Sequence, residues 1–376
     1  MKILLIGEAS FVQNTLKKGL EERGHNVTTM SDGNNWHNAP RDIDLRRNMK
    51  WGKLGGLMVL VKLLLYLPKL IGNDIVQIHN YQFVPLKYKW NTLLFRFLKR
   101  FNGHVVKLCL GDDPLILSKQ AEGIPRYSDT YWHGKEQNRE QNRERIAELT
   151  LPAAVDNWKQ TSDRAHALVA CLYEYWLCYE SSPYGDKLLY CGLPIVLPDK
   201  KLQRVRNSSR KTLRILVGLQ PKRDFMKGAG RIAALVEQIK SRCTTELKIQ
   251  IKYVEGVPYD EYMKLLTWAD VLVDQFYSFT PSMNSLAAMA RGTVVIGGGE
   301  EEYYQFIGEP FLRPIINVSP EFSDEENMDI IEKALFTEGN LTRLSRQSIA
   351  FVEKYHDYRK IALQFEHIYR DLAWAL

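Results

Sequence analysis

The amino-acid sequence predicts an α/β protein of two domains, each built on a parallel sheet. At 376 residues the chain is longer than one hydrophobic core usually serves. Short apolar segments alternate with longer helical patterns, as expected for parallel strands joined by helices. Residues 197–211 are polar and lack apolar periodicity, so we place the linker there. We therefore expect a first domain over residues 1–197 and a second over residues 211–350.

The first series of elements predicts the core of the first domain. Buried strands are expected at Lys2–Ile6, Asp74–Ile78, Val105–Leu110 and Ala167–Leu172, with helices at Ser10–Arg23 and Val84–Phe101. Residues 123–145 are irregular, and we expect a surface insertion followed by a helix. Residues 357–376 carry an apolar stripe at helical spacing, and we expect this last helix to pack back on the first domain.

The second series predicts a similar layered core. Strands are expected at Leu213–Gly218, Leu247–Tyr253, Asp270–Asp274, Val294–Ile296 and Arg313–Ile316, with helices at Lys227–Lys240, Tyr259–Trp268, Pro281–Arg291 and Ser323–Leu335. In parallel α/β sheets, ligands usually bind outside the carboxyl ends of the strands. We therefore look for site residues where strands end.

Composition and motifs narrow the class of protein. Hydrophobic residues make up 45% and charged residues 25%, as is usual for a globular chain. The apolar start Met1–Gly7 is too short for a signal peptide, and the five cysteines include no C-x-x-C pair, so we expect a cytoplasmic protein with reduced thiols. The turns that follow the two first strands, at Gly7 and Gly218, lack the G-x-G-x-x-G fingerprint, and there is no Walker motif. A nicotinamide enzyme is therefore not expected.

One region is strongly basic. Residues 46–107 contain twelve Lys or Arg and one acidic residue, Asp74, whereas the whole chain carries a net charge of +7. Residues 53–70 are apolar nearly all round but include Lys62 and Pro68, which argues against a spanning helix. Residues 84–101 mix cations with aromatic side chains. We expect residues 46–107 to contact an anionic membrane surface; the alternatives are a packed core with solvated lysines, or RNA binding, for which no motif is found.

The start of the predicted helix at 281–291 is a candidate anion site. Thr280 suits the N-cap, and Pro281 suits the first helical position, where its missing N–H costs nothing. The N–H groups of Met283 and Asn284 would then be free to meet an anion. The alternative is an ordinary strand–helix–strand unit whose helix start is capped by its own side chains.

The loop Gly218–Gly228 is a second candidate, because it follows a buried strand and carries Lys222, Arg223 and Lys227. Arginine can clamp a phosphate through two hydrogen bonds, and lysine supplies a point charge. The alternative is a solvated basic loop. Taken together, the two segments favour a diphosphate ligand.

The order and spacing of these segments resemble a known family. Trp268-Ala-Asp270 through Leu286–Ile296 resembles the donor-site signature of retaining GT-B glycosyltransferases of family 4, and Gly218–Gly228 resembles the element that grips the donor diphosphate. Gly7–Ser10, Ser31–Asn34 and Gln77–Asn80 resemble the acceptor domain of bacterial members. The family usually has glutamates at the positions that here hold Phe279 and Ala287.

The resemblance implies a fold and an activity. The fold is the GT-B architecture, in which two Rossmann-like domains face each other across a cleft. The activity is metal-independent transfer of a sugar from a UDP- or GDP-linked donor to a glycan or lipid-linked acceptor, in surface-polysaccharide synthesis at the inner face of the membrane. No resident cofactor and no nucleic-acid partner are expected. Because of Phe279 and Ala287, the alternative is a catalytically inactive sugar-nucleotide-binding homologue with a scaffolding role.

Site residues follow from the resemblance and from the two anion-binding segments. We expect catalysis from Arg223, Lys227 and Asp113, donor binding from Gly218, Ser282, Met283, Asn284, Glu300, Glu301 and Glu302, and acceptor-side contacts from Gly7, Ser10, His79 and Gly111. Fixed positive charge would stabilise the departing diphosphate. Asp113 has an alternative role as the cap of a helix beginning at Pro114, and the glutamates have one as the start of a helix at Glu301–Phe306.

Overall fold

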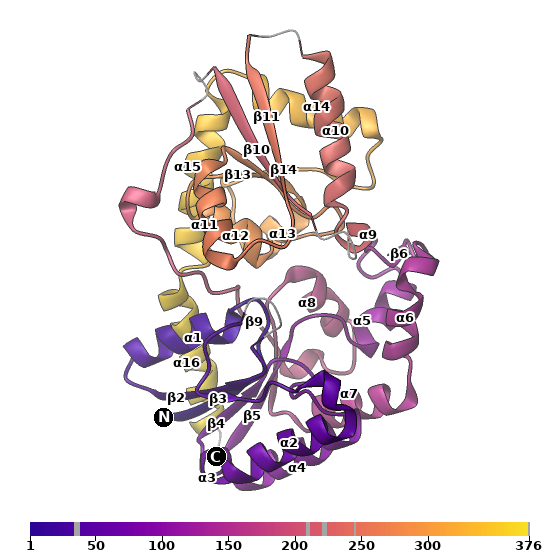
Figure 1. The fold of residues 1–376 in the computed structure, drawn as a ribbon, viewed down its shortest axis with the longest axis vertical. Coiled ribbons are helices and arrows are strands. Elements are labelled where there is room, and N and C mark those ends of the chain that lie inside the picture. Colours follow the sequence, from indigo (N-terminus) through magenta and orange to yellow (C-terminus); the bar gives the residue numbers. More distant parts are fainter. Residues whose placement is uncertain (34–37, 208–210, 220–223, 244–245, 375–376) are drawn as a thin grey trace. The chain divides into compact units, whose positions relative to one another are not determined.

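The computed structural model describes residues 1–33, 38–207, 211–219, 224–243 and 246–374 (Figure 1). The chain divides into two compact units. Unit 1 comprises Met1–Lys119, Asn142–Pro194 and Tyr358–Leu376, and unit 2 comprises Gln120–Gln141 and Ile195–Asp357. The prediction placed residues 120–141 in the first domain, whereas their contacts place them in unit 2.

Unit 1 contains a seven-stranded parallel sheet. Its strands are β1 (Lys2–Ile6), β2 (Asn26–Ser31), β3 (Ile43–Asp44), β4 (Ile75–Ile78), β5 (His104–Cys109), β8 (Ala167–Ala170) and β9 (Leu188–Tyr190). They lie in the order β3-β2-β1-β4-β5-β8-β9, and Ile3 in β1 pairs with Val27 on one side and Ile75 on the other. Because both faces of a parallel sheet are covered by helices, its central strands are mostly apolar, and Ile3–Ile6 are completely buried. Two polar residues, Gln77 in β4 and Lys107 in β5, are also completely buried.

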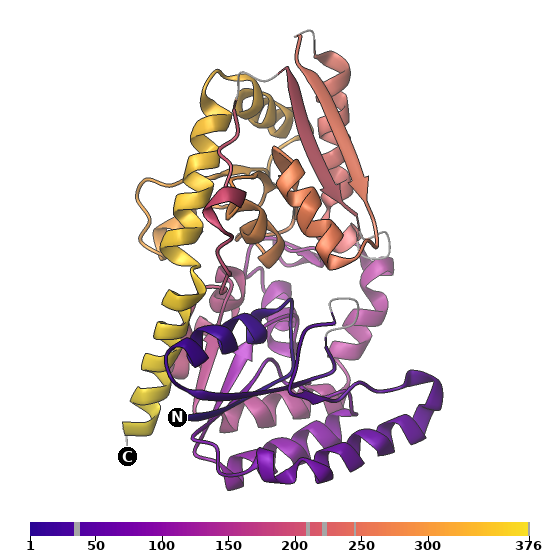
Figure 2. The same ribbon diagram turned by 60° about the vertical axis from the view of Figure 1, so that its left-hand side comes forward.

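Helices surround this sheet. They are α1 (Val12–Glu22), α2 (Gly52–Leu65), α3 (Leu67–Leu70), α4 (Tyr88–Phe101), α5 (Pro114–Ala121), α6 (Arg139–Leu149), α7 (Pro152–Arg164), α8 (Tyr173–Glu180) and α16 (Tyr358–Trp374), with 3₁₀ turns at Met49–Trp51 and Gly185–Lys187. The last helix, α16, runs along α1 (Figure 2). Tyr358 donates a hydrogen bond from its hydroxyl to Glu22 at 2.6 Å, and the guanidinium of Arg359 donates to the same carboxylate at 3.0 Å.

Unit 2 contains a five-stranded parallel sheet and a small hairpin. The strands β10 (Thr212–Gly218), β11 (Lys248–Val254), β12 (Val271–Val273), β13 (Val294–Gly297) and β14 (Ile315–Asn317) lie in the order β11-β10-β12-β13-β14. The helices are α9 (Asp224–Lys227), α10 (Ala229–Arg242), α11 (Tyr259–Trp268), α12 (Met283–Met289), α13 (Glu301–Phe306), α14 (Asp324–Phe336) and α15 (Asn340–Tyr355), with a 3₁₀ turn at Lys200–Leu202. The hairpin pairs β6 (Tyr131–Trp132) with β7 (Lys135–Glu136).

The predicted fold class, with two parallel α/β units, is confirmed. All nine predicted strands are present, with ends that differ by at most two residues. The prediction missed β2, β3, β9 and the hairpin strands β6 and β7. The strand β2 contains two threonines and an asparagine among its six residues, and β3, β6 and β7 have only two residues each. Within the described residues, no helix is both long and apolar enough to cross a bilayer.

Candidate functional site

The strand order of unit 2 locates its ligand-binding edge. The chain places β11 on one side of β10 and β12 on the other, so the direction of winding reverses between β10 and β12. Ligands of open α/β sheets bind at this switch point, outside the carboxyl ends of the strands. Gly218 ends β10 there, and Asp274 directly follows β12.

The turn at Lys227 and Gly228 is held firmly at this edge. The backbone N–H of Phe276, which follows β12, donates to the carbonyl oxygen of Lys227 at 2.6 Å. Gly228 has φ +69°, and a Cβ atom there would lie 2.7 Å from the Cβ of Phe276, so only glycine fits. Lys227 is partly buried, and its ammonium makes no ion pair with the described residues. The Lys227 charge therefore sits on a fixed backbone, whereas Arg223 lies outside the described residues.

The start of α12 differs from the prediction. Ser282, rather than Thr280, is the N-cap, because its hydroxyl accepts from the backbone N–H of Ser285 at 3.4 Å. The buried Asp274 carboxylate accepts from the Ser282 hydroxyl at 2.7 Å, from the Asn284 amide at 3.2 Å and from the Ser285 hydroxyl. The Asp274 carboxylate thus adds negative charge where the prediction placed an anion, and the alternative, a helix start capped by its own side chains, fits better.

Two features of this helix start remain compatible with ligand binding: its backbone N–H groups and the neighbouring Tyr262 hydroxyl. The N–H groups of Met283 and Asn284 find no acceptor among the residues that the structure describes. Tyr262 donates its hydroxyl to the Asn284 side-chain oxygen at 2.8 Å, and a Cβ on Gly218 would lie 3.3 Å from that hydroxyl. Burial, and then the charge of Asp274, raise the pKa of Tyr262, so it remains a neutral donor. Gly218, Tyr262 and the α12 start therefore form one polar edge.

The three consecutive glutamates are already paired. The guanidinium of Arg126 binds Glu300 at 2.8 Å and both oxygens of Glu302 at 2.6 Å, and it also contacts Glu321. Glu301 pairs with Arg313 at 2.5 Å. Glu300 is the N-cap residue of α13, and the other two lie in its first turn. The predicted role in donor binding is not supported by this geometry, because these carboxylates neutralise arginines and start a helix.

The insertion that carries Arg126 also covers the position of a family glutamate. The Tyr127 ring stacks on Phe279 with centroids 4.3 Å apart, and the Arg126 guanidinium lies 4.9 Å from the Phe279 ring centre. The Tyr127 hydroxyl donates to Glu300 at 2.8 Å. Phe279 is consequently 1% exposed. Sequence reasoning missed Arg126 and Tyr127, since no motif surrounds them.

In unit 1 the switch point lies between β1 and β4. Gly7 directly follows β1 and has φ +82°, and a Cβ there would lie 1.8 Å from Nδ1 of His79, which follows β4. Nδ1 is buried and has no hydrogen-bond partner within the described part of the chain. Burial lowers the pKa of His79 to about 4, so the ring is neutral at pH 7. The structure thus brings Gly7 and His79 together, and their predicted role on the acceptor side stays a prediction.

The helix start beside Gly7 is closed by an acid. The buried Glu8 carboxylate accepts from the backbone N–H groups of Gln13 at 3.1 Å and Asn14 at 2.9 Å. Ser10 and Phe11 hold the left-handed conformation, with φ +50° and +67°. Because Glu8 occupies the positive end of α1, this turn offers no phosphate site. Ser10 shapes the turn through its backbone.

Asp113 is a structural residue in this fold. It is completely buried; one oxygen accepts from the backbone N–H of Ile116 at 2.9 Å, and the other accepts from the Tyr179 hydroxyl. The prediction that Asp113 contacts a sugar hydroxyl is therefore wrong for this structure, in which Asp113 caps the start of α5. Gly111 is exposed at the end of β5 with φ +79°, and a Cβ there would meet only the Asn80 amide, at 3.8 Å.

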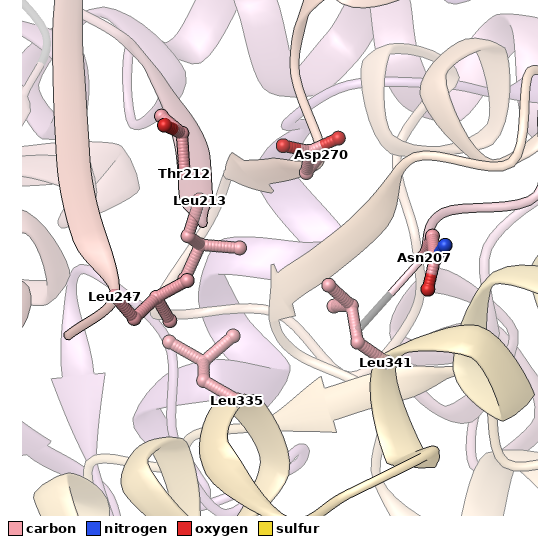
Figure 3. A pocket seen from close by; sticks show the side chains of 7 residues that line it. All are labelled: Asn207, Thr212, Leu213, Leu247, Asp270, Leu335 and Leu341. Atoms are coloured by element: carbon pink, nitrogen blue, oxygen red, sulfur yellow. The ribbon is translucent and has the colours of Figure 1, made fainter. Parts of the chain in front are cut away.

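A small pocket in unit 2 lies at the other end of the sheet (Figure 3). It is lined by Asn207, Thr212, Leu213, Leu247, Asp270, Leu335 and Leu341. Thr212 begins β10 and Asp270 precedes β12, so the pocket adjoins the amino ends of the strands. It is separate from the candidate site. Among the described residues, no group of three or more His, Cys, Asp or Glu is arranged to hold a metal ion.

Comparisons with known proteins identify the fold. No protein-family model and no curated protein sequence matches the chain. Sucrose-phosphate synthase from Thermosynechococcus elongatus superposes with a TM-score of 0.61 at 13% identity, covering 100% of both chains. WaaG, a glycosyltransferase involved in lipopolysaccharide biosynthesis, gives 0.59 at 13% identity, covering 97% of this chain and 99% of its own. Anabaena HepE in complex with UDP and glucose gives 0.57 at 12% identity, covering 99% and 100%. The chain has the GT-B fold of these glycosyltransferases.

Proposed function

We propose that the protein transfers a sugar from a UDP- or GDP-linked donor to a glycan or lipid-linked acceptor. The observation that carries the proposal is Lys227, which lies at the switch point of unit 2 on a held backbone and has no ion-pair partner among the described residues. The chain that carries it has, over 99% of its length, the fold of HepE in complex with UDP and glucose. Unit 2 is the donor side in this proposal, and the Gly7–His79 turn of unit 1 is the acceptor side.

The chemistry needs positive charge where the sugar–phosphate bond breaks. Negative charge grows on the departing diphosphate, and groups that are already oriented stabilise it without reorganisation. The backbone of Lys227 is held by the hydrogen bond that its carbonyl oxygen accepts from the Phe276 N–H and by the glycine that follows it. The N–H groups of Met283 and Asn284 are candidate partners for a second phosphate oxygen. Metal independence and retention of anomeric configuration belong to the proposal through the family resemblance alone.

The cellular setting is part of the same proposal. We place the reaction in surface-polysaccharide synthesis at the cytoplasmic face of the membrane. The likeness to WaaG, involved in lipopolysaccharide biosynthesis, supports that setting.

The test is release of nucleoside diphosphate by the purified protein from UDP-glucose, GDP-mannose and ADP-glucose. Lys227→Ala should lower the rate about hundredfold, the typical effect of removing one electrostatic contact to a transition state. Lys333→Ala is the matched control, because Lys333 is exposed on α14 near the amino ends of the strands. Equal rates in the two variants would contradict the assignment of Lys227.

A second candidate is a homologue that binds nucleotide sugars without turnover. Three observations favour it: Ala287 has no carboxylate, Phe279 is covered by Tyr127, and Glu300 is neutralised by Arg126. Donors would then raise the melting temperature by mass action, whereas no nucleotide would be released in the presence of any acceptor glycan. This pattern would separate the two functions.

A further inference from the structure

One helix of unit 1, α2, is apolar both on the face that packs and on the face that meets solvent. Val59 and Leu63 are buried in a cluster that includes Phe95 and Leu98 of the neighbouring α4. The opposite face consists of Leu54, Leu57, Met58, Val61, Leu64 and Leu65, which are between 43% and 73% exposed. A water-exposed helix face normally carries polar side chains. A continuous exposed apolar face of this size therefore marks a contact surface.

The dimensions of α2 decide how it can meet a membrane. The helix has 14 residues, so at 1.5 Å per residue it is about 21 Å long, shorter than the hydrocarbon core of about 30 Å. It cannot span. Leu54, Leu57, Val61 and Leu65 recur at helical spacing on one side, as in helices that lie flat in the interface between headgroups and acyl chains. Trp51 and Tyr66 flank the two ends and are 49% and 40% exposed, which suits the same interface.

The adjoining helix supplies positive charge. In both views α4 runs next to α2 (Figures 1 and 2). Lys89, Arg96 and Arg100 are exposed on α4, together with Trp90 and Phe101. Residues 46–107 carry twelve basic side chains and one acidic one, although Lys107 is completely buried and Asp44 pairs with Arg46. The apolar strip of α2 thus adjoins a helix with exposed cations.

The charge selects among possible partners. A symmetric dimer through this face would bring two like-charged surfaces together, which costs free energy. An anionic bilayer satisfies both features, because acyl chains accept the apolar strip and phosphate headgroups attract the cations. We propose that α2 lies in the plane of an anionic lipid bilayer with its exposed leucines among the acyl chains, while the α4 cations contact the headgroups. This surface rests on the membrane setting of the proposed function and names the elements that would make the contact, but vesicle binding can be measured without any transferase activity.

The test is flotation of the full chain with vesicles of phosphatidylcholine, alone or with about one-third phosphatidylglycerol. The wild type should bind the anionic vesicles, and less at high salt, because ions screen the headgroup charge. Leu57→Glu/Leu64→Glu should lower the partition coefficient at least about tenfold, since each buried carboxylate opposes insertion. The matched control is Phe311→Glu, which adds a charge at an 82% exposed position of unit 2 and should bind like the wild type.

A triple variant, Lys89→Gln/Arg96→Gln/Arg100→Gln, isolates the headgroup contribution. It should lose most of the preference for anionic vesicles, with far-UV circular dichroism unchanged because all three side chains are exposed. Failure of the wild type to float with anionic vesicles would overturn the proposal. So would unaltered binding by Leu57→Glu/Leu64→Glu, a wild-type dimer that this variant makes monomeric without any vesicle binding, or retention of the wild type on RNA in place of vesicles.

Discussion

The turns that follow the first strand of each unit have the same place in their sheets but opposite charge. In unit 1, Gly7 leads to Glu8, whose buried carboxylate occupies the start of α1. In unit 2, Gly218 ends β10, and the short helix α9 that comes next in the chain ends in Lys227, a cation without an ion-pair partner among the described residues. Only the second turn offers positive potential to a phosphate. The fold thus repeats, while single residues decide which turn is acidic and which is basic, and we propose that only the basic turn holds a nucleotide.

The largest expected effect comes from filling the turn of unit 1. Gly7→Ala places a Cβ 1.8 Å from His79 at a positive φ, so the free energy of unfolding should fall by about 2–4 kcal/mol in urea titrations. Gly24→Ala is the control, because Gly24 has φ +83° with no atom within 4 Å; it should lose about 1 kcal/mol. Equal losses would mean that the close approach of His79 does not matter.

The corresponding change in unit 2 should affect both stability and activity. In Gly228→Ala the new Cβ would lie 2.7 Å from Phe276, so we expect a loss of about 2–3 kcal/mol together with lowered nucleotide release, because the Lys227 backbone must move. Gly256→Ala is the control, because Gly256 has φ +61° and no atom within 4 Å of the added Cβ. This variant should lose only the stability that an alanine loses at positive φ, and its rate of nucleotide release should not change. A Gly228→Ala variant with normal turnover would argue against a fixed lysine.

Removing the acid of unit 1 sharpens the comparison further. Glu8→Gln should lower the free energy of unfolding by about 1–2 kcal/mol, because an amide cannot accept all the hydrogen bonds that the carboxylate accepts from the start of α1. Nucleoside diphosphate affinity should stay the same, as measured by calorimetry. A gain or loss of affinity in this variant would indicate that the unit 1 turn also meets the nucleotide.

A further prediction concerns pH. Burial lowers the pKa of His79 from 6.5 to about 4 in the folded state, so the unfolded chain binds the proton more tightly. Stability due to the neutral ring is present above pH 6.5 and is lost as pH falls towards 4. His79→Gln should therefore lose less stability than the wild type over this window in urea titrations. Parallel pH profiles for the two proteins would contradict the buried, neutral histidine.

Local patterns in the sequence account for most of the fold. Continuous apolar runs such as Lys2–Ile6 identify buried strands, because both faces of the sheet are covered. The strand Asn26–Ser31 lacks this pattern and was missed. The exposed face of α2 could not be separated from its packed face, because leucines occupy both.

The site is less accessible to sequence reasoning, because its contacts join distant residues. Arg126 pairs with Glu300 across 174 positions, and no local pattern reports this pair. The sequence leaves two roles open for Asp113, contact with a sugar hydroxyl and capping of a helix. Its complete burial and the hydrogen bond that it accepts from the Ile116 N–H indicate the capping role. Thr280 and Ser282 flank Pro281, and both residue types are good N-caps. The sequence therefore could not show which of them precedes α12, and the backbone conformation identifies Ser282.

Calorimetric titration of UDP and GDP into the wild type, Lys227→Ala and Lys333→Ala tests the central claim most directly. The account predicts that the wild type and Lys333→Ala bind one nucleotide with equal affinity, and that Lys227→Ala binds at least about tenfold more weakly, since a charged contact to phosphate is lost. Equal binding by all three proteins, or no binding by the wild type, would contradict it.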